Sequence, residues 1–135
     1  MLIDSNIFIE IARKQKEYRT CLDLINVINS ESLGEDAYIT KFSLHAIEAI
    51  LGKKDLEFVK KILLLIHQDK IKVYDFDIGD HIMIASAIDT LGLDFDDATQ
   101  YVAANKLFTY LVTLDKDFKK TGIRTKTPKQ VLFQT

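Results

Sequence analysis

Short apolar runs, each followed by helical segments, constrain the fold of this chain more than any other feature of its sequence. Residues 1–4, 37–40, 71–74 and 110–114 have the composition of short buried strands, and residues 123–125 are a weaker fifth candidate. Two helical segments separate each of the first three runs from the next, and none separates the fourth from the fifth. Because parallel strands need helical crossovers, this order predicts an α/β fold: a three-layer α/β/α sandwich with a central, mainly parallel four- to five-stranded sheet.

The spacing of apolar residues gives approximate helix boundaries. Helices are predicted over residues 5–14, 18–29, 43–51, 56–66, 78–91 and 97–107. Ser43 is the predicted N-cap of the third helix, and Gly52 and Gly92 are placed to end the third and the fifth. The fifth is marked by Ile78, Ile82, Ala85 and Ile88. A length of 135 residues fits one domain, residues 1–135.

Charge and cysteine content narrow the functional classes. With 18 basic and 20 acidic residues, the net charge of −2 gives no overall attraction to nucleic acid or anionic lipid, so a polyanionic partner must be held by a local patch or by bound cations. The single Cys21 excludes an intrachain disulfide and suits a reducing compartment. The purest apolar run, residues 62–66, is too short to cross a bilayer. We therefore expect a cytoplasmic protein with no membrane partner.

Acidic residues fall where a parallel sheet places its ligands. Asp4 ends the first predicted strand, and Asp115 directly follows the 110–114 strand. The carboxyl ends of parallel strands form the ligand-binding edge of such a sheet, so these two carboxylates are expected to meet there. Asp97 opens the alanine-rich predicted helix.

Glu48 is unusual because it shares a helical stripe with Leu44 and Leu51, which predicts an inward-facing carboxylate. Such a group needs a partner, and neither Lys41 nor Lys53 lies on that stripe.

Each acid also has an ordinary interpretation. Asp4, Asp94, Asp96 and Asp97 suit helix caps or first turns, Glu48 suits the rim of the core, and Asp115 and Asp117 suit a turn or the surface. Residues 73–105 hold seven aspartates and no lysine or arginine, which indicates charge that awaits a cation. The alternative there is a solvated acidic face carrying Asp80 and Asp89. Taken together at one sheet edge, the acids favour a site.

Electrostatics limits what such a cluster can bind. Four carboxylates about 5 Å apart repel one another by roughly 20 kcal/mol at an effective dielectric near 20. A domain of this size is stable by only about 5–15 kcal/mol. The cluster must therefore be spread out, partly protonated or neutralised by a metal ion. Oxygen ligands favour Mg²⁺ or Mn²⁺ over Zn²⁺, and the three histidines lack zinc-site spacing.

Four motifs in this order resemble those of PIN-domain nucleases, and in particular VapC-like toxin ribonucleases. The family's opening strand followed by Asp-Ser/Thr-Asn matches residues 2–6, and its helix-borne glutamate matches Glu48. The Asp-Ala pair that opens its alanine-rich helix matches Asp97 and Ala98. Its strand ending Val-Thr-x-Asp-x-Asp-Phe matches residues 112–118 without a gap. The resemblance covers essentially the whole chain and implies a PIN-like fold.

The resemblance implies divalent-metal-dependent hydrolysis of RNA phosphodiester bonds, with Mg²⁺ or Mn²⁺ as the cofactor and no covalent enzyme intermediate. The implied catalytic and metal-binding residues are Asp4, Glu48, Asp97 and Asp115. Asn6 and Thr113 would support them, and Asp117 would act through a second metal or a water. Asp94 or Asp96 is an alternative to Asp97, which is favoured because it precedes Ala98 and keeps the family's spacing to Asp115.

Basic residues are expected to flank an acidic centre that binds RNA. Lys116, Lys119 and Lys120 follow Asp115 closely and are the first candidates, ahead of Arg124, Lys126 and Lys129. The alternative for each is a solvated surface.

Apolar residues near 22–33 and 63–66 exceed what one layer obviously needs. We expect these residues to belong to the core, to a homodimer face or, as the resemblance suggests, to a groove for an antitoxin.

Two other functions remain open. One is a catalytically silent PIN-like module that binds RNA or protein. The other is a phosphohydrolase with Asp4 as nucleophile, which is disfavoured because Asn6 occupies the place where that chemistry usually needs a second acid.

Overall fold

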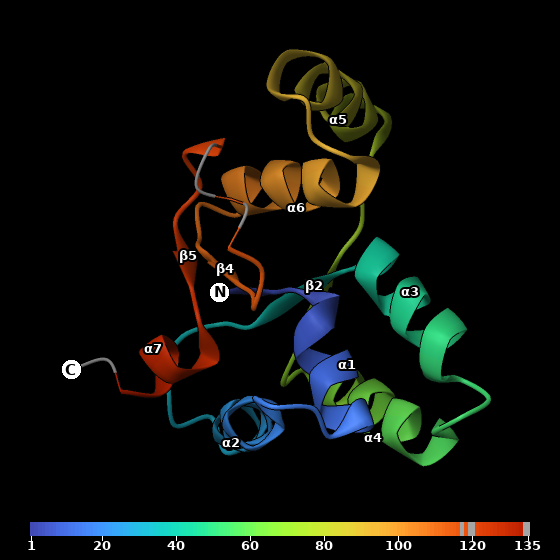
Figure 1. Ribbon diagram of the computed structural model, residues 1–135, viewed down its shortest axis with the longest axis vertical. Helices are drawn as coiled ribbons and strands as arrows, with labels where there is room; N and C mark the ends of the chain where they lie inside the picture. The colour runs from blue at the N-terminus through green and yellow to red at the C-terminus, as the bar shows by residue number, and fades with distance from the viewer. Residues whose placement is uncertain (117, 119–120, 134–135) are drawn as a thin grey trace.

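A computed structural model describes residues 1–116, 118 and 121–133. Its core is a five-stranded, all-parallel sheet in the order β3-β2-β1-β4-β5 (Figure 1). The strands are β1 (Leu2–Ile3), β2 (Tyr38–Thr40), β3 (Lys72–Tyr74), β4 (Leu111–Val112) and β5 (Thr125–Lys126). Leu2 of the central strand lies opposite Tyr38 on one side and Leu111 on the other. The predicted parallel sheet is confirmed, and β1 at its centre carries Asp4 at its carboxyl end.

Helices cover both faces of the sheet (Figure 1). They are α1 (Ser5–Arg13), α2 (Tyr18–Asn29), α3 (Lys41–Leu51), α4 (Leu56–His67), α5 (Ile78–Leu91), α6 (Phe95–Lys106) and α7 (Pro128–Leu132). Neighbouring strand residues point to opposite faces. Ile3 and Val112 join the core under α1 to α4, whereas Leu2 and Leu111 pack with Ala103 of α6. The predicted three-layer α/β/α sandwich is therefore confirmed.

Several boundaries differ from the prediction because other side chains cap the helices. Thr40, and not Ser43, is the N-cap of α3: its hydroxyl accepts the Ser43 N–H at 2.9 Å, so the helix begins at Lys41. Gly52 does follow the end of α3, where an added Cβ would lie 2.4 Å from the Glu48 carbonyl oxygen. Gly92 ends α5 in the left-handed conformation, as predicted.

The last part of the chain departs most from the predicted elements. β4 ends at Val112: the Thr113 N–H still donates to the Lys126 carbonyl, but the N–H groups of Leu114 and Asp115 donate to the side chains of Asn6 and Thr113. β5 lies at residues 125–126 in place of the predicted 123–125. Helix α7 was not predicted, although a capping box between Thr127 and Gln130 precedes its apolar residues.

Helix α5 packs against α6 through Ile84 and Ala87. The apolar stripe that predicts this helix faces the other way, with Ile78 79% and Ile82 68% exposed. Met83 beside them is also exposed. We call Ile78, Ile82 and Met83 the outer face of α5. A helix that is apolar on nearly all sides is normally covered by another surface.

Two other expectations about burial are settled by the structure. The interpretation of Asp80 as part of a solvated acidic face is wrong, because the residue is buried. Of the surplus apolar residues, Ile25 and Ile28 belong to the core, whereas Leu22, Leu63 and Leu64 are exposed.

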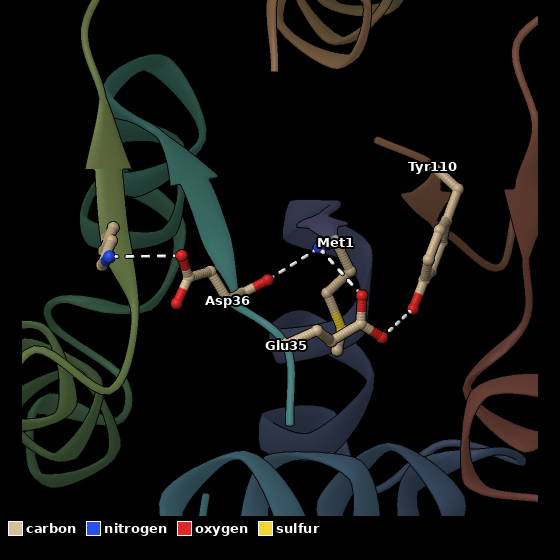
Figure 2. Close-up of polar contacts among 5 residues, drawn as sticks. Met1, Glu35, Asp36 and Tyr110 are labelled. Carbon is tan, nitrogen blue, oxygen red and sulfur yellow. Dashed lines mark hydrogen bonds and ion pairs between the residues drawn. The ribbon is translucent and has the colours of Figure 1, made fainter. Parts of the chain in front are cut away.

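Charged groups at the amino ends of the strands are paired with opposite charges (Figure 2). The Met1 amine donates to the Asp36 carbonyl at 2.7 Å and lies 3.6 Å from a Glu35 carboxylate oxygen. The Tyr110 hydroxyl donates to the other oxygen of that carboxylate at 2.5 Å, and Lys72 pairs with the Asp36 side chain. Burial lowers the pKa of the amine, and Glu35 opposes that shift. This end of the sheet is electrically balanced.

Within the described part of the chain, no helix combines the length and apolar character needed to cross a membrane.

Candidate active site

Asp4 lies at the carboxyl end of the central strand and is also the N-cap of α1. Its side chain is almost buried, at 7% exposure, and accepts the Asn6 backbone N–H and the Ser5 hydroxyl at 3.4 Å each. The shortest bond comes from the Thr113 hydroxyl, which donates to Asp4 Oδ2 at 2.7 Å. The ordinary interpretation as a cap is therefore correct, but burial of this carboxylate goes beyond what a cap requires.

Asn6 and Thr113 connect the ends of β1 and β4. The Asn6 amide donates to Thr113 Oγ1 at 3.1 Å, and the Asp115 backbone N–H donates to the same oxygen at 3.0 Å. Since Thr113 receives two hydrogen bonds, its own proton is directed at Asp4. The Leu114 N–H also donates to Asn6 Oδ1, at 3.4 Å. This network fixes the Asp4 carboxylate and brings Asp115 to the same edge.

Helix α6 brings further acids to this edge with its N-terminus. Its N-cap is Asp94, so the helix begins at Phe95 and Asp97 lies in the first turn. The prediction that Asp97 opens this helix is therefore wrong. The Asp97 N–H donates to Asp94 Oδ1 at 2.8 Å. Acids in a first turn are stabilised by the partial positive charge of the helix end. The helix end therefore favours an aspartate at each of positions 94, 96 and 97, whether or not the residue also takes part in a site at the sheet edge.

Repulsion among the acids shows in their pKa values. Burial raises the pKa of Asp4, and the charges of Asp97 and Asp115 raise it further, against the lowering effect of its hydrogen bonds from Thr113 and Asn6. Desolvation, followed by repulsion from Asp4, Asp94 and Asp115, raises the pKa of Asp96 to about 6. The structure thus brings Asp4, Asp97 and Asp115 within electrostatic reach of one another, with Asp96 alongside.

The prediction that the Glu48 carboxylate faces inward is wrong. Its side chain is 42% exposed, and one of its oxygens lies 3.3 Å from His45 Nδ1 on the preceding turn of α3. The partner is thus neither Lys41, which pairs with Asp75, nor Lys53. After desolvation, the charges that raise the pKa of Asp4 and of Asp96 are those of other aspartates.

The sequence matches the PIN domain family model over residues 1–124. The chain is a PIN domain. PIN domains are generally nucleases that use divalent metals.

Two solved structures similar to this PIN domain are toxin–antitoxin complexes. One is VapBC2 from Rickettsia felis, bound to a DNA fragment from its promoter; the chains share 14% identity and a TM-score of 0.69, over 93% of this chain and 96% of the other. The other, from Klebsiella pneumoniae, shares 19% identity and a TM-score of 0.67, over 94% and 96%. At these identities the likeness concerns the fold. No curated protein gives a sequence match.

The donor set of the PIN domain fits a hard divalent cation. Its nearby acids supply carboxylate oxygens, and their mutual repulsion is what such an ion would relieve. Among the described residues, no three acidic, histidine or cysteine side chains already converge tightly enough for a metal ion. The aspartates are therefore gathered at one edge without forming a closed set of ligands.

The basic and outer acidic candidates are only partly described. Lys116 is exposed and follows Asp115 at this edge. Asp117, Lys119 and Lys120 lie outside the described residues.

One positioning contact was missed by the sequence analysis. The buried Gln100 amide donates to the Ser43 hydroxyl at 2.9 Å and so ties α6, which carries Asp97, to α3. A glutamine among the alanines of α6 is the signal that could have indicated it.

Proposed function

We propose that this PIN domain is an endoribonuclease that hydrolyses RNA phosphodiester bonds with Mg²⁺ or Mn²⁺, and that it is the toxin of a VapBC-type toxin–antitoxin pair acting in the cytoplasm. The observation that carries the proposal is the buried Asp4 at the carboxyl end of the central strand, with Asp97 and Asp115 close enough to raise its pKa. Membership of a family of nucleases supports it.

Asp4, Asp97 and Asp115 would hold the cation, and Glu48 is the proposed fourth carboxylate. When bound, a divalent cation supplies positive charge that lowers the pKa of water and stabilises negative charge on the phosphodiester. Thr113 and Asn6 hold the Asp4 carboxylate in one orientation through their hydrogen bonds. Binding through Glu48 would compete with its contact to His45 Nδ1. Asp117 keeps its proposed supporting role.

Cleavage of RNA by the purified protein tests the proposal. We expect cleavage with Mg²⁺ or Mn²⁺ that EDTA abolishes, with products that carry a 5′-phosphate and a 3′-hydroxyl. Asp4→Asn and Asp97→Asn should lose this activity, whereas Asp89→Asn, at an exposed position on α5, should keep it. Equal activity in all variants and in EDTA would contradict the proposal.

The proposed partners are an antitoxin and a second copy of the chain. The antitoxin is proposed because two structural neighbours are toxin–antitoxin complexes. Expression together with the product of an adjacent gene, followed by co-purification and inhibition of cleavage, tests this.

For the homodimer we propose contact through the outer face of α5. Its exposed neighbours include Gly79, Ala85 and Ser86, which are small and uncharged, so two copies can meet there with like charges opposed only near Asp77 and Asp89. Ile82→Glu should shift the protein to the monomer in analytical ultracentrifugation, whereas Leu64→Glu on exposed α4 should not. The opposite result would place the dimer contact on α4.

A silent PIN-like module that binds RNA or protein is the second candidate function. The contact between Glu48 and His45 favours it, because a carboxylate held by His45 is less available as a metal ligand. Calorimetric titration with Mn²⁺ distinguishes the two: the silent module gives neither heat of binding nor cleavage.

A further inference from the structure

Two phenylalanines form an aromatic contact between α3 and α6 outside the hydrophobic core. Phe42 lies in the first turn of α3, and Phe95 is the first residue of α6. Their rings pack edge to face, with centroids 5.1 Å apart. Among the described residues, the buried core clusters and the side chains packed against them include neither ring. We call Phe42 and Phe95 the phenylalanine pair.

The phenylalanine pair lies at the carboxyl edge of the sheet, next to the acids. Helix α3 begins directly after β2, and its beginning lies close to that of α6 (Figure 1). Asp96 follows Phe95 in the chain, and repulsion from Asp4 and Asp115 adds to desolvation in raising its pKa. The pair therefore borders the acids that are proposed to bind the cation.

Phe95 is not needed to begin its helix. The N-cap of α6 is Asp94, and the apolar residue before this cap, Leu93, belongs to the same buried cluster as Ala98. These two residues occupy the positions whose apolar contact normally fixes the start of a helix. Phe95 has 46% of its surface exposed. The exposed part of its ring is available to a ligand that is bound at the acids.

The contact with Phe42 prepares the Phe95 ring for stacking. The two ring planes are inclined by 75°, so the partly buried Phe42 ring holds the orientation of Phe95 without covering its exposed part. A side chain that is already held in place loses little conformational entropy when a ligand binds. Nucleobases stack on such rings, and one stacked base contributes about fivefold to 150-fold in affinity.

We infer that the phenylalanine pair is a nucleobase subsite, in which a base next to the cleaved phosphodiester bond stacks on the exposed ring of Phe95. The inference rests on the proposed function. Every base has an aromatic face, so the subsite accepts all four bases and favours the larger purines. A base is favoured over an apolar protein side chain because exposed carboxylates, those of Asp94 and Asp96, flank Phe95 in the chain. They suit the amino groups on the edge of a base better than an apolar partner.

Binding of a short, fluorescently labelled oligoribonucleotide tests the subsite. Anisotropy is measured in Mg²⁺ with Asp4→Asn as the background, which prevents cleavage. Phe95→Ala should weaken binding at least about fivefold, and the slope of log affinity against log salt should not change because no charge is removed. Phe95→Trp should keep the affinity, since it keeps an aromatic face.

Phe108→Ala is the matched control for this measurement. The Phe108 ring is 93% exposed, but it follows the other end of α6, about 18 Å away along the helix. Its removal should leave the affinity for a short oligoribonucleotide unchanged.

An abasic substrate distinguishes stacking from a structural role of the ring. The bond that the wild type cleaves is mapped first, and the base on each side of it is then removed in turn. One of these abasic substrates should lower kcat/KM of the wild type at least about fivefold, but should not lower that of Phe95→Ala further. Because the chain contains no tryptophan, the fluorescence of Phe95→Trp should be quenched by the intact oligoribonucleotide and not by the abasic one.

Each contrary result has a separate meaning. If the wild type cleaves RNA but Phe95→Ala behaves like Phe108→Ala, the subsite is wrong and the proposed function stands. If Phe95→Ala responds to the abasic substrates as the wild type does, the ring has only a structural role and the inference is overturned. If an antitoxin quenches Phe95→Trp and RNA does not, the pair is a protein contact and the inference is overturned. If the wild type neither binds nor cleaves RNA, both proposals fail.

Discussion

Asp4 and Asp80 are both aspartates and both almost fully buried, but their electrostatic surroundings are opposite. Asp80, at 2% exposure, accepts the Tyr74 hydroxyl at 2.8 Å and the Asp77 N–H at 3.2 Å, and lies 3.6 Å from the Lys106 ammonium. Burial would raise the pKa of Asp80, but these partners together lower it. For Asp4 burial prevails, and neighbouring acids add to it.

The difference separates an acid that stabilises the fold from one that the fold tolerates. Asp80 joins β3, α5 and α6 through opposite charge and hydrogen bonds, as expected of a structural carboxylate. Asp4 is held in place by Thr113 while like charges surround it. Such unfavourable arrangements concentrate at functional sites, where stability is exchanged for activity. Buried acid alone is thus a poor guide to function, whereas a buried acid among other acids is a better one.

The largest predicted effect is on catalysis. Asp4→Asn should reduce Mg²⁺-dependent RNA cleavage at least about 100-fold, because it removes a carboxylate from the proposed cation site. Asp80→Asn, measured well below its melting temperature, should stay within about threefold of wild type. Single-turnover cleavage rates measure both, and circular dichroism checks the fold. Similar losses in the two variants would remove the functional distinction between the two aspartates.

The same two variants should change stability by different amounts. Asp80→Asn should lower the free energy of unfolding by about 1–3 kcal/mol, because it weakens a buried, charge-assisted network. Asp4→Asn should change it by less than about 1 kcal/mol, because the loss of the hydrogen bond from Thr113 is offset by the removal of a repelled charge. Urea unfolding with an unchanged m-value measures both. An equally large destabilisation by Asp4→Asn would show that repulsion at the sheet edge is already neutralised.

The stabilising effect of Asp80 should depend on pH. Its pKa in the folded protein is below the ordinary 3.8, so its contribution is present above that ordinary value and is lost as the pH falls through the folded pKa. The stability difference between wild type and Asp80→Asn should therefore be constant near neutral pH and shrink below about pH 4. Urea midpoints across this range measure it. A difference that persists at pH 2 would indicate a steric cause.

The sequence predicted the fold and the meeting of Asp4 and Asp115 at one sheet edge, because both follow from local rules. Apolar runs and crossovers determine a parallel sheet, and that sheet alone brings Asp4 and Asp115 to one edge. What failed depended on tertiary contacts. The helical spacing of apolar residues does not show that Glu48 contacts His45 on α3. It also does not show which side of α5 packs against α6 and which side, with Ile78, is exposed. Asp80 looked solvated because Tyr74 and Lys106, its partners, come from other elements.

The smallest predicted effect is stabilisation by the cation itself, and it bears directly on the comparison. At a concentration ten times its dissociation constant, a ligand that binds only the folded state adds about 1.4 kcal/mol of stability. Mg²⁺ or Mn²⁺ should therefore raise the melting temperature of the wild type and of Asp80→Asn by a few degrees. The shift should be absent in Asp4→Asn. NaCl at equal ionic strength, free of Ca²⁺, is the control for general electrostatic screening by salt. An equal shift in all three proteins would mean that the ion binds elsewhere, and the repulsion around Asp4 would then need another explanation.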